Sequence, residues 1–136
     1  MKSEAQLVIT ETPAKGILRL IMNDQNSKNA LSNKMINDLF KAISFANNKK
    51  SIKVIIIAAN GHVFSAGHDL KEITKARNNK DNGDNFYKEL FNSCSALMQA
   101  IVNSPKPTIA EVNGVATAAG CQLVASCDVA IASDLS

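Results

Sequence analysis

The amino-acid sequence predicts an α/β fold in which parallel strands alternate with helices. The run Val54–Ala59 is apolar throughout, as in a strand buried on both faces of a parallel sheet, and Thr108–Val112 is a second such run with one charged residue. Between them, apolar residues recur every three to four positions, which is the period of an amphipathic helix. Two successive β-α-β units favour a layered fold with right-handed crossovers.

The N-terminal part predicts a hairpin followed by an amphipathic helix. Residues 7–9 and 16–22 form two short apolar runs joined by a turn that contains proline. Ser32 is the expected N-cap of the helix, and Leu31 is placed to pack on Ile36 across that cap. The apolar stripe of this helix comprises Met35, Leu39, Ala42 or Ile43, and Ala46.

The middle of the chain predicts a short helix and a long one. Asp69 is the expected N-cap of the short helix, with Glu72 at the capping-box spacing, and the helix ends near Ala76. The polar segment 77–84 is the expected mobile loop, and Asp84 is the expected cap of the long helix. The stripe of the long helix comprises Phe86, Leu90, Cys94, Leu97 or Met98, and Ile101.

The C-terminal part predicts a strand, a turn of small residues, a helix and a last strand. After Thr108–Val112 the chain turns at residues 113–114 and passes through small residues at 115–120. Such residues let a ligand approach the free backbone N–H groups at the start of a helix. The last strand is Val129–Ala132, and the apolar side of the helix comprises Leu123, Val124 and Cys127.

Two motifs in this order resemble the signatures of the enoyl-CoA hydratase/isomerase, or crotonase, superfamily. They are F-S-A-G-x-D-L-K-E at residues 64–72 and N-G-x-A-x-x-x-G-C at residues 113–121. The resemblance covers nearly the whole chain and implies the ClpP/crotonase spiral of β-β-α units. Members of the superfamily are generally longer, so residues 1–136 are expected to be a truncated chain, the N-terminal portion of a single crotonase-like domain.

The resemblance also implies a site for an acyl-CoA thioester. The superfamily's oxyanion hole maps to the backbone N–H groups of His68 and Ala119, which would stabilise a thioester enolate. Glycine is usual at position 119, and alanine is expected to keep the donor while narrowing the pocket. No metal and no separate cofactor are implied, because coenzyme A is part of the substrate. The residues implied in its binding are Ala66, His68, Asp69, Leu70 and Lys71.

The main departure from the superfamily is Gln122, which stands where its hydratases place a catalytic glutamate. An amide accepts no proton in the working pH range, so Gln122 could only orient a water molecule. The second glutamate of those hydratases would lie beyond Ser136. Two functions therefore stay open for the parent protein: a hydratase- or isomerase-like lyase of fatty-acid metabolism, and a non-catalytic or regulatory acyl-CoA-binding relative. The truncated chain alone is expected to be inactive.

Four side chains near these motifs have more than one interpretation. The His68 ring could act as an acid or base, or the residue could contribute only its backbone N–H. Asp69 could be a catalytic carboxylate or a helix cap, and Lys71 a base or a solvated lysine near a CoA phosphate. Glu111, a charge in an apolar strand, is either a buried acid/base or a carboxylate that meets solvent or a lysine.

Composition limits the remaining classes. The net charge of +3 is spread among acidic residues, which argues against nucleic-acid binding, and no apolar run reaches the roughly 18 residues of a membrane span. Without a leader-like N-terminus, the expected location is the cytoplasm, or the mitochondrion for a eukaryotic parent with a presequence. Three cysteines without a C-x-x-C pair are interpreted as small buried apolar residues. The resemblance implies a homotrimer, or a dimer of trimers, for the full-length protein.

Overall fold

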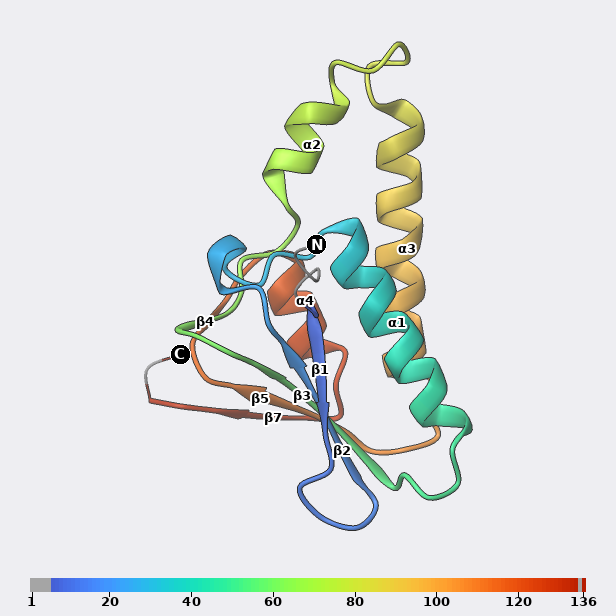
Figure 1. Cartoon of the computed structure of the whole chain (residues 1–136), viewed down its shortest axis with the longest axis vertical. Helices are drawn as coiled ribbons and strands as arrows, with labels where there is room; N and C mark the ends of the chain where they lie inside the picture. The colour runs from blue at the N-terminus through green and yellow to red at the C-terminus, as the bar shows by residue number, and fades with distance from the viewer. Residues whose placement is uncertain (1–5, 135) are drawn as a thin grey trace, which may run out of the picture.

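A five-stranded sheet forms the centre of the molecule (Figure 1). The computed structural model describes residues 6–134 and 136. Strand β1 pairs antiparallel with β2, and every other neighbouring pair in this sheet is parallel. The predicted α/β class is therefore confirmed. In spatial order the strands are β1 (Val8–Glu11), β2 (Ile17–Met22), β3 (Val54–Ala59), β5 (Thr108–Val112) and β7 (Val129–Ala132).

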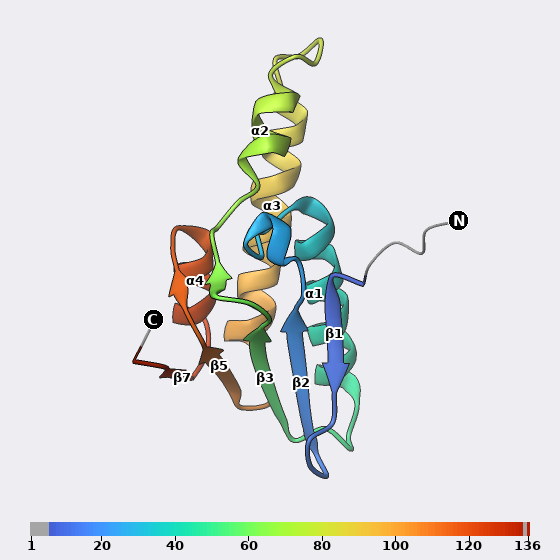
Figure 2. The ribbon, with the colours of Figure 1, turned by 60° about the vertical axis from the view of Figure 1, so that its left-hand side comes forward.

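Helices α1 (Asn33–Asn48) and α3 (Asp84–Val102) pack against each other and cover one face of the sheet (Figure 2). The two predicted apolar stripes are confirmed, because they are buried in one core with alternate residues of β2 and β3. At the "Ala42 or Ile43" position, Ile43 is the buried residue. The core side chains with essentially no exposed surface include Leu20, Met22, Met35, Leu39, Ile43, Ile55, Ile57, Leu90 and Leu97.

Two short helices lie nearer the carboxyl ends of the parallel strands. Helix α2 (Leu70–Ala76) and the adjoining end of α3 extend beyond the sheet, while α4 (Ala119–Ala125) lies beside it (Figures 1 and 2). A 3₁₀ turn, η1 (Gln25–Ser27), occupies the polar segment after β2. The predicted mobile loop is a series of hydrogen-bonded turns, and its mobility stays a prediction.

Of the three predicted helix N-caps, Ser32 and Asp69 are confirmed and Asp84 is corrected. The Ser32 hydroxyl accepts a hydrogen bond from the Met35 N–H at 3.1 Å, as expected. Asp84 is the first residue of α3 and does not cap it. Gly83 is the N-cap residue, and the Asp81 side chain accepts hydrogen bonds from the N–H groups of Gly83 at 3.1 Å and Asn85 at 3.0 Å.

The capping box between Asp69 and Glu72 is the second correction. Asp69 does cap α2, since its carboxylate accepts from the Lys71 N–H at 2.8 Å. Glu72 accepts instead from the N–H of Asn33, the first residue of α1, at 3.0 Å. The first N–H groups of any helix lack partners within it, so a carboxylate on a neighbouring helix can satisfy one of them. Glu72 therefore ties α2 to the start of α1.

A second sheet, which the sequence pattern did not indicate, lies beyond the carboxyl edge of the first. Its two parallel strands are β4 (Val63–Ser65) and β6 (Val115–Ala116). Both fall in segments expected to be loops, because strands of two or three residues are too short to show an alternating pattern. This small sheet connects the two loops that contain the motifs.

Candidate functional site

The two motif-bearing loops are held together by backbone contacts at the carboxyl edge of the sheet. Val63 pairs with Val115 in the β4–β6 sheet, and the Thr117 N–H donates to the Ser65 carbonyl at 3.0 Å. Glycine is required where the backbones touch. A Cβ atom at Gly114 would lie 2.1 Å from the His62 carbonyl oxygen, and one at Gly120 would lie 2.5 Å from the Ser65 carbonyl oxygen.

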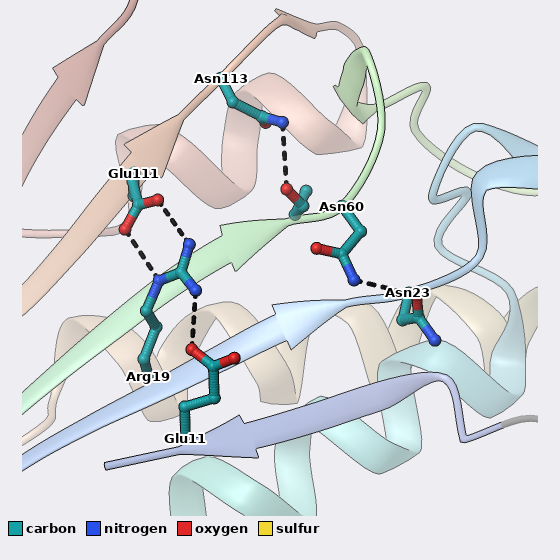
Figure 3. A network of polar contacts seen from close by, with 7 residues as sticks. Glu11, Arg19, Asn23, Asn60, Glu111 and Asn113 are labelled. Atoms are coloured by element: carbon teal, nitrogen blue, oxygen red, sulfur yellow. Dashed lines mark hydrogen bonds and ion pairs between the residues drawn. The ribbon is translucent and has the colours of Figure 1, made fainter. Parts of the chain in front are cut away.

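Asparagine side chains fix these loops to the ends of the strands (Figure 3). Asn113, directly after β5, donates to the carbonyls of Ala59 at 3.0 Å and Gly61 at 2.7 Å. Asn60, directly after β3, donates to the side chain of Asn23, which directly follows β2. This role of the asparagines was not predicted from the sequence. Its available signal was the asparagine that immediately follows each of these three strands.

The structure places Gly67, the residue before His68, against Ala118 and Ala119. Gly67 has φ +85°, and a Cβ atom built on it would lie 3.2 Å from the Ala119 nitrogen and 2.9 Å from the Ala118 Cβ. Within the described residues, neither the His68 N–H nor the Ala119 N–H donates to a backbone or side-chain acceptor. The two backbone donors of the expected oxyanion hole therefore lie on loops in contact, and both are available.

Backbone strain in this loop falls on Ala118 rather than on Ala119. Ala118 has φ +51° and ψ −125°, a combination that normally requires glycine. Ala119 begins α4 in helical conformation, so alanine there fits without strain, as expected. The methyl group of Ala118 in this conformation costs about 1–2 kcal/mol.

A cavity of about 340 Å³ lies beside His68. It is lined by all five residues expected to contact coenzyme A, together with Asn26, Ser27, Lys28 and Ala30 from the segment after β2. That segment is joined to the motif loop by two backbone hydrogen bonds, from Ala66 N–H to Lys28 O at 3.1 Å and from Leu31 N–H to Gly67 O at 2.7 Å. Lys28, which the sequence analysis did not single out, places a second lysine beside Lys71.

The side chains of the first motif are partly engaged with the protein. The His68 Nδ1 lies 3.4 Å from the Leu31 carbonyl oxygen, and its ring meets Phe91 of α3 edge-on with centroids 5.5 Å apart. Asp69 acts as the cap of α2, which confirms that interpretation. Lys71 is exposed on the first turn of α2 and lines the cavity.

Gln122 is exposed on α4, two residues after the helix-packing glycine Gly120. The backbone carbonyl of Gln122 accepts a hydrogen bond from the Ser126 hydroxyl at 2.8 Å. No hydrogen bond joins the side-chain amide of Gln122 to another described residue. The position is thus open to solvent or to a further segment. It carries a group that can donate and accept hydrogen bonds but cannot transfer a proton.

The three cysteines differ in environment, so the prediction that all are buried is confirmed for Cys94 alone and is wrong for Cys121. Cys94 is buried in the core, Cys127 is half-buried at the end of α4, and Cys121 is exposed. Cys121 lies on the outer side of α4, where no described element covers it. Burial, with a smaller contribution from the Asp128 charge, raises the pKa of the Cys127 thiol to about 11. Burial also raises the pKa of Cys94.

Glu111 is not an isolated buried carboxylate. It accepts two hydrogen bonds from Arg19, at 2.9 Å from Nε and 2.6 Å from Nη2, and Arg19 also contacts Glu11 at 2.9 Å (Figure 3). These bonds, those to Glu111 above all, raise the pKa of the Arg19 guanidinium above its ordinary value. The Glu111 side chain is 44% exposed, so it meets both solvent and a cation, as one interpretation expected. Its partner is an arginine from β2 rather than a lysine.

Neither a metal-ligand cluster nor a membrane-spanning helix is found in residues 6–134 and 136. In that part of the chain, no three His, Cys, Asp or Glu side chains are grouped so that they could hold a metal ion. None of the helices described there combines the length and the apolar character needed to cross a membrane.

Comparison with known proteins gives consistent results. Residues 12–136 match the family model described as enoyl-CoA hydratase/isomerase. The chain is 51% identical over 121 residues to enoyl-CoA hydratase domain-containing protein 3, mitochondrial, of Xenopus laevis, covering 89% of this chain and 40% of that protein. It is 47% identical over 135 residues to the Mus musculus protein of the same name, covering 98% of this chain and 43% of the relative.

A solved structure confirms the fold. The crystal structure of human enoyl Coenzyme A hydratase domain-containing protein 3 superimposes with a TM-score of 0.87 at 44% identity, covering 96% of this chain and 49% of the human chain. The chain therefore spans less than half of the length of these relatives. The predicted crotonase-like fold is confirmed for the portion that the chain contains.

Proposed function

The chain belongs to the enoyl-CoA hydratase/isomerase family, and from that premise we propose that its parent protein binds an acyl-CoA thioester at the carboxyl edge of the sheet. The thioester carbonyl would accept hydrogen bonds from the N–H groups of His68 and Ala119. One observation carries the proposal: these two donors lie on loops in contact, and neither donates to another described residue. Fixed donors of this kind stabilise negative charge that develops on an acyl oxygen.

The cavity beside His68 supports coenzyme A as the remainder of the ligand. Lys28 and Lys71 both line it, and lysine ammonium groups suit the phosphates of a nucleotide. Backbone and apolar atoms of Ala66, Ala30 and Leu70 line the same cavity and would contact the less polar pantetheine.

The chemistry that these residues can supply is polarisation of the thioester. When charge moves onto the carbonyl oxygen to form an enolate, each N–H donor contributes on the order of 3 kcal/mol to the stabilisation of that charge. Hydration also requires a base for the attacking water and an acid for the α-carbon. Gln122 can orient water but cannot take either role, so the acid/base groups of an active parent would have to be other residues, either the His68 ring or groups outside this chain.

Gln122 favours a second candidate, a non-catalytic or regulatory protein that binds acyl-CoA. Such a protein would keep both N–H donors and the cavity, while the absence of a glutamate at position 122 would leave bound thioesters unreacted. Glu111, which is paired with Arg19, offers no free carboxylate in its place.

A role in fatty-acid metabolism and assembly as a homotrimer, or a dimer of trimers, remain parts of the proposal for the full-length protein. The exposed apolar residues Val129 and Ile131 on β7 support further packing there, since they are 52% and 62% exposed. The vertebrate relatives are named as mitochondrial proteins. We extend that location to a parent with a targeting segment and expect the cytoplasm otherwise.

Binding and turnover are tested separately. Crotonyl-CoA is added to the full-length protein, and the loss of enone absorbance measures hydration. In parallel, the infrared band of the bound thioester carbonyl measures polarisation, which is expected to lower its frequency. Turnover supports the enzyme, whereas a lowered carbonyl frequency without turnover supports the binding protein. An unshifted carbonyl band contradicts both.

Two variants of Ala119 test whether the lowered carbonyl frequency is caused by the backbone N–H donors. Ala119→Pro removes one N–H at the first position of a helix, where proline is tolerated, and is expected to return the carbonyl band toward its free value. Ala119→Gly keeps the N–H and serves as the control. For the acid/base question, Gln122→Glu is expected to raise turnover if the missing carboxylate is what limits the reaction.

A further inference from the structure

A second cavity lies at the opposite, amino edge of the sheet. Its volume is about 630 Å³. The turn between β1 and β2 and the end of α1 meet there, on the side of the sheet away from α2 (Figures 1 and 2). No motif of the sequence analysis falls in it. Its lining residues are Thr12, Lys15, Gly16, Ile17, Leu18, Phe45, Lys49, Ser51, Ile52 and Lys53.

The charged groups of this cavity are all positive. Lys15, Lys49 and Lys53 line it, and no aspartate or glutamate among the residues that the structure describes does. None of the three lysines forms an ion pair with a carboxylate of the described residues, whereas Arg19 and Lys88 elsewhere in the chain are paired. Three ammonium groups around one cavity repel one another unless an anion lies between them.

The rest of the lining is largely apolar. Ile52 and Leu18 are buried beneath the cavity, while Phe45 is 57% exposed at its edge. The Lys49 ammonium lies 4.9 Å from the centre of the Phe45 ring, which places a positive charge at the border of the apolar surface. The side chain of Lys53 lies over Gly16, since a Cβ atom at Gly16 would be 3.1 Å from the Lys53 Cγ.

Lysines near the end of a helix often interact only with its last carbonyl groups. Here another lysine does so. The Lys106 ammonium donates to the carbonyls of Ala46 and Lys49 at the end of α1. The three lysines of the cavity are therefore not required for that purpose, and none of their ammonium groups donates a hydrogen bond to a carbonyl of the described residues.

From these observations we propose that the amino-edge cavity binds a small amphipathic anion, with a carboxylate or phosphate head between Lys15, Lys49 and Lys53 and an apolar body on Phe45 and Ile52. A volume of this size is typical of sites for small molecules, which combine apolar walls with a few polar groups. The site is separate from the proposed thioester site, because the two cavities share no lining residue.

The test is an NMR titration of the ¹⁵N-labelled chain with octanoate and, as a neutral analogue, 1-octanol. Octanoate is expected to shift the amide signals of Gly16, Ser51, Ile52 and Lys53 to saturation, with octanol at least tenfold weaker. Octyl phosphate, titrated in the same way, separates the two head groups. Equal binding of octanol, shifts confined to other parts of the chain, or no saturation would overturn the proposal.

Variants test whether the cavity lysines and Phe45 contact the bound octanoate. Replacing Lys15, Lys49 and Lys53 together by glutamine is expected to weaken octanoate binding at least tenfold, and Phe45→Ala to weaken it severalfold. Lys80→Gln, in the loop between α2 and α3, changes the net charge without touching the cavity and should leave binding unchanged. An equal loss in Lys80→Gln would show a general charge effect and contradict the site.

A parallel titration with coenzyme A distinguishes a failure of the amino-edge site from a failure of the proposed thioester site. In the triple-glutamine variant, shifts at His68 and Ala119 caused by coenzyme A should persist, because those residues lie at the other edge of the sheet. Loss of octanoate binding with coenzyme A binding retained supports two independent sites. Loss of both, in a variant with an otherwise unchanged spectrum, contradicts their independence.

Discussion

The two edges of the sheet each carry a cavity lined by lysines, but they are built in different ways. At the carboxyl edge, backbone touches backbone at Gly114 and Gly120, and Asn113 fixes the loops to neighbouring strands. At the amino edge, the cavity is formed by side chains at the surface, and its three lysines form no ion pair with a carboxylate of residues 6–134 or 136. A site made of backbone donors needs a rigid frame, whereas a site made of flexible charged side chains does not. The two edges should therefore differ in their tolerance of mutation.

The largest expected difference between the two edges is the loss of unfolding free energy when a glycine is replaced by alanine. In Gly114→Ala, the new Cβ would lie 2.1 Å from the carbonyl oxygen of His62, so the β4–β6 sheet must separate, and we expect a loss of about 3 kcal/mol in unfolding free energy. The amino-edge control is Gly16→Ala, where the nearest atom is in the flexible Lys53 side chain and the left-handed backbone costs about 1 kcal/mol. Urea denaturation measures both, and equal losses would refute the difference in rigidity.

A smaller loss of unfolding free energy is expected on replacing Asn113, which joins the loops to the strands. Asn113→Ala removes two hydrogen bonds to the carbonyls of Ala59 and Gly61, and we expect a loss of about 1–2 kcal/mol. The control is Asn48→Ala, which removes one exposed bond to Ser44 within α1 and should change stability by less than about 0.5 kcal/mol. If the two variants unfold at the same urea concentration, Asn113 does not stabilise the loops.

Because the backbone is strained at Ala118 and not at Ala119, replacing each by glycine is expected to change the unfolding free energy in opposite directions. Ala118→Gly relieves a strain of about 1–2 kcal/mol at φ +51°, and after the entropy cost of glycine it should stabilise the chain by about 0.5–1 kcal/mol. Ala119→Gly lies in a helix and should destabilise it by about 0.5–1 kcal/mol. Thermal unfolding distinguishes them, and a loss of stability in Ala118→Gly would mean that the methyl group makes a compensating contact.

The smallest expected effect is a difference in thiol reactivity between the two ends of α4, with no change in stability. Cys121, near the carboxyl edge, is exposed, whereas burial raises the pKa of Cys127 at the far end to about 11. Only the thiolate reacts, and with that pKa about one Cys127 thiol in a thousand is ionised at pH 8. Iodoacetamide should therefore label Cys121 first, and labelling of Cys127 should increase as the pH rises toward 11. Mass spectrometry of the labelled peptides checks the order.

Much of the fold could be predicted from the sequence because its signals are local. The apolar periods of α1 and α3, the Ser32 and Asp69 caps and the strand Val54–Ala59 each depend on residues within a few positions of one another. The five residues expected around coenzyme A do line one cavity, because a single loop carries them. The β4–β6 sheet, by contrast, pairs segments about fifty residues apart and too short to show a period of their own.

By itself, the sequence determined the longer helices and the strands of the five-stranded sheet, and its motifs identified the family and the loops that carry the candidate donors. Only the tertiary structure decided which groups meet: that Glu72 binds the start of α1, that Arg19 pairs with Glu111, that the glycine-like conformation falls on Ala118, and that two separate segments place lysines around one cavity. The physical reason is the range of the interactions. Periodicity and capping act between near neighbours in the chain, whereas hydrogen bonds, ion pairs and steric contacts between loops depend on how distant segments are packed.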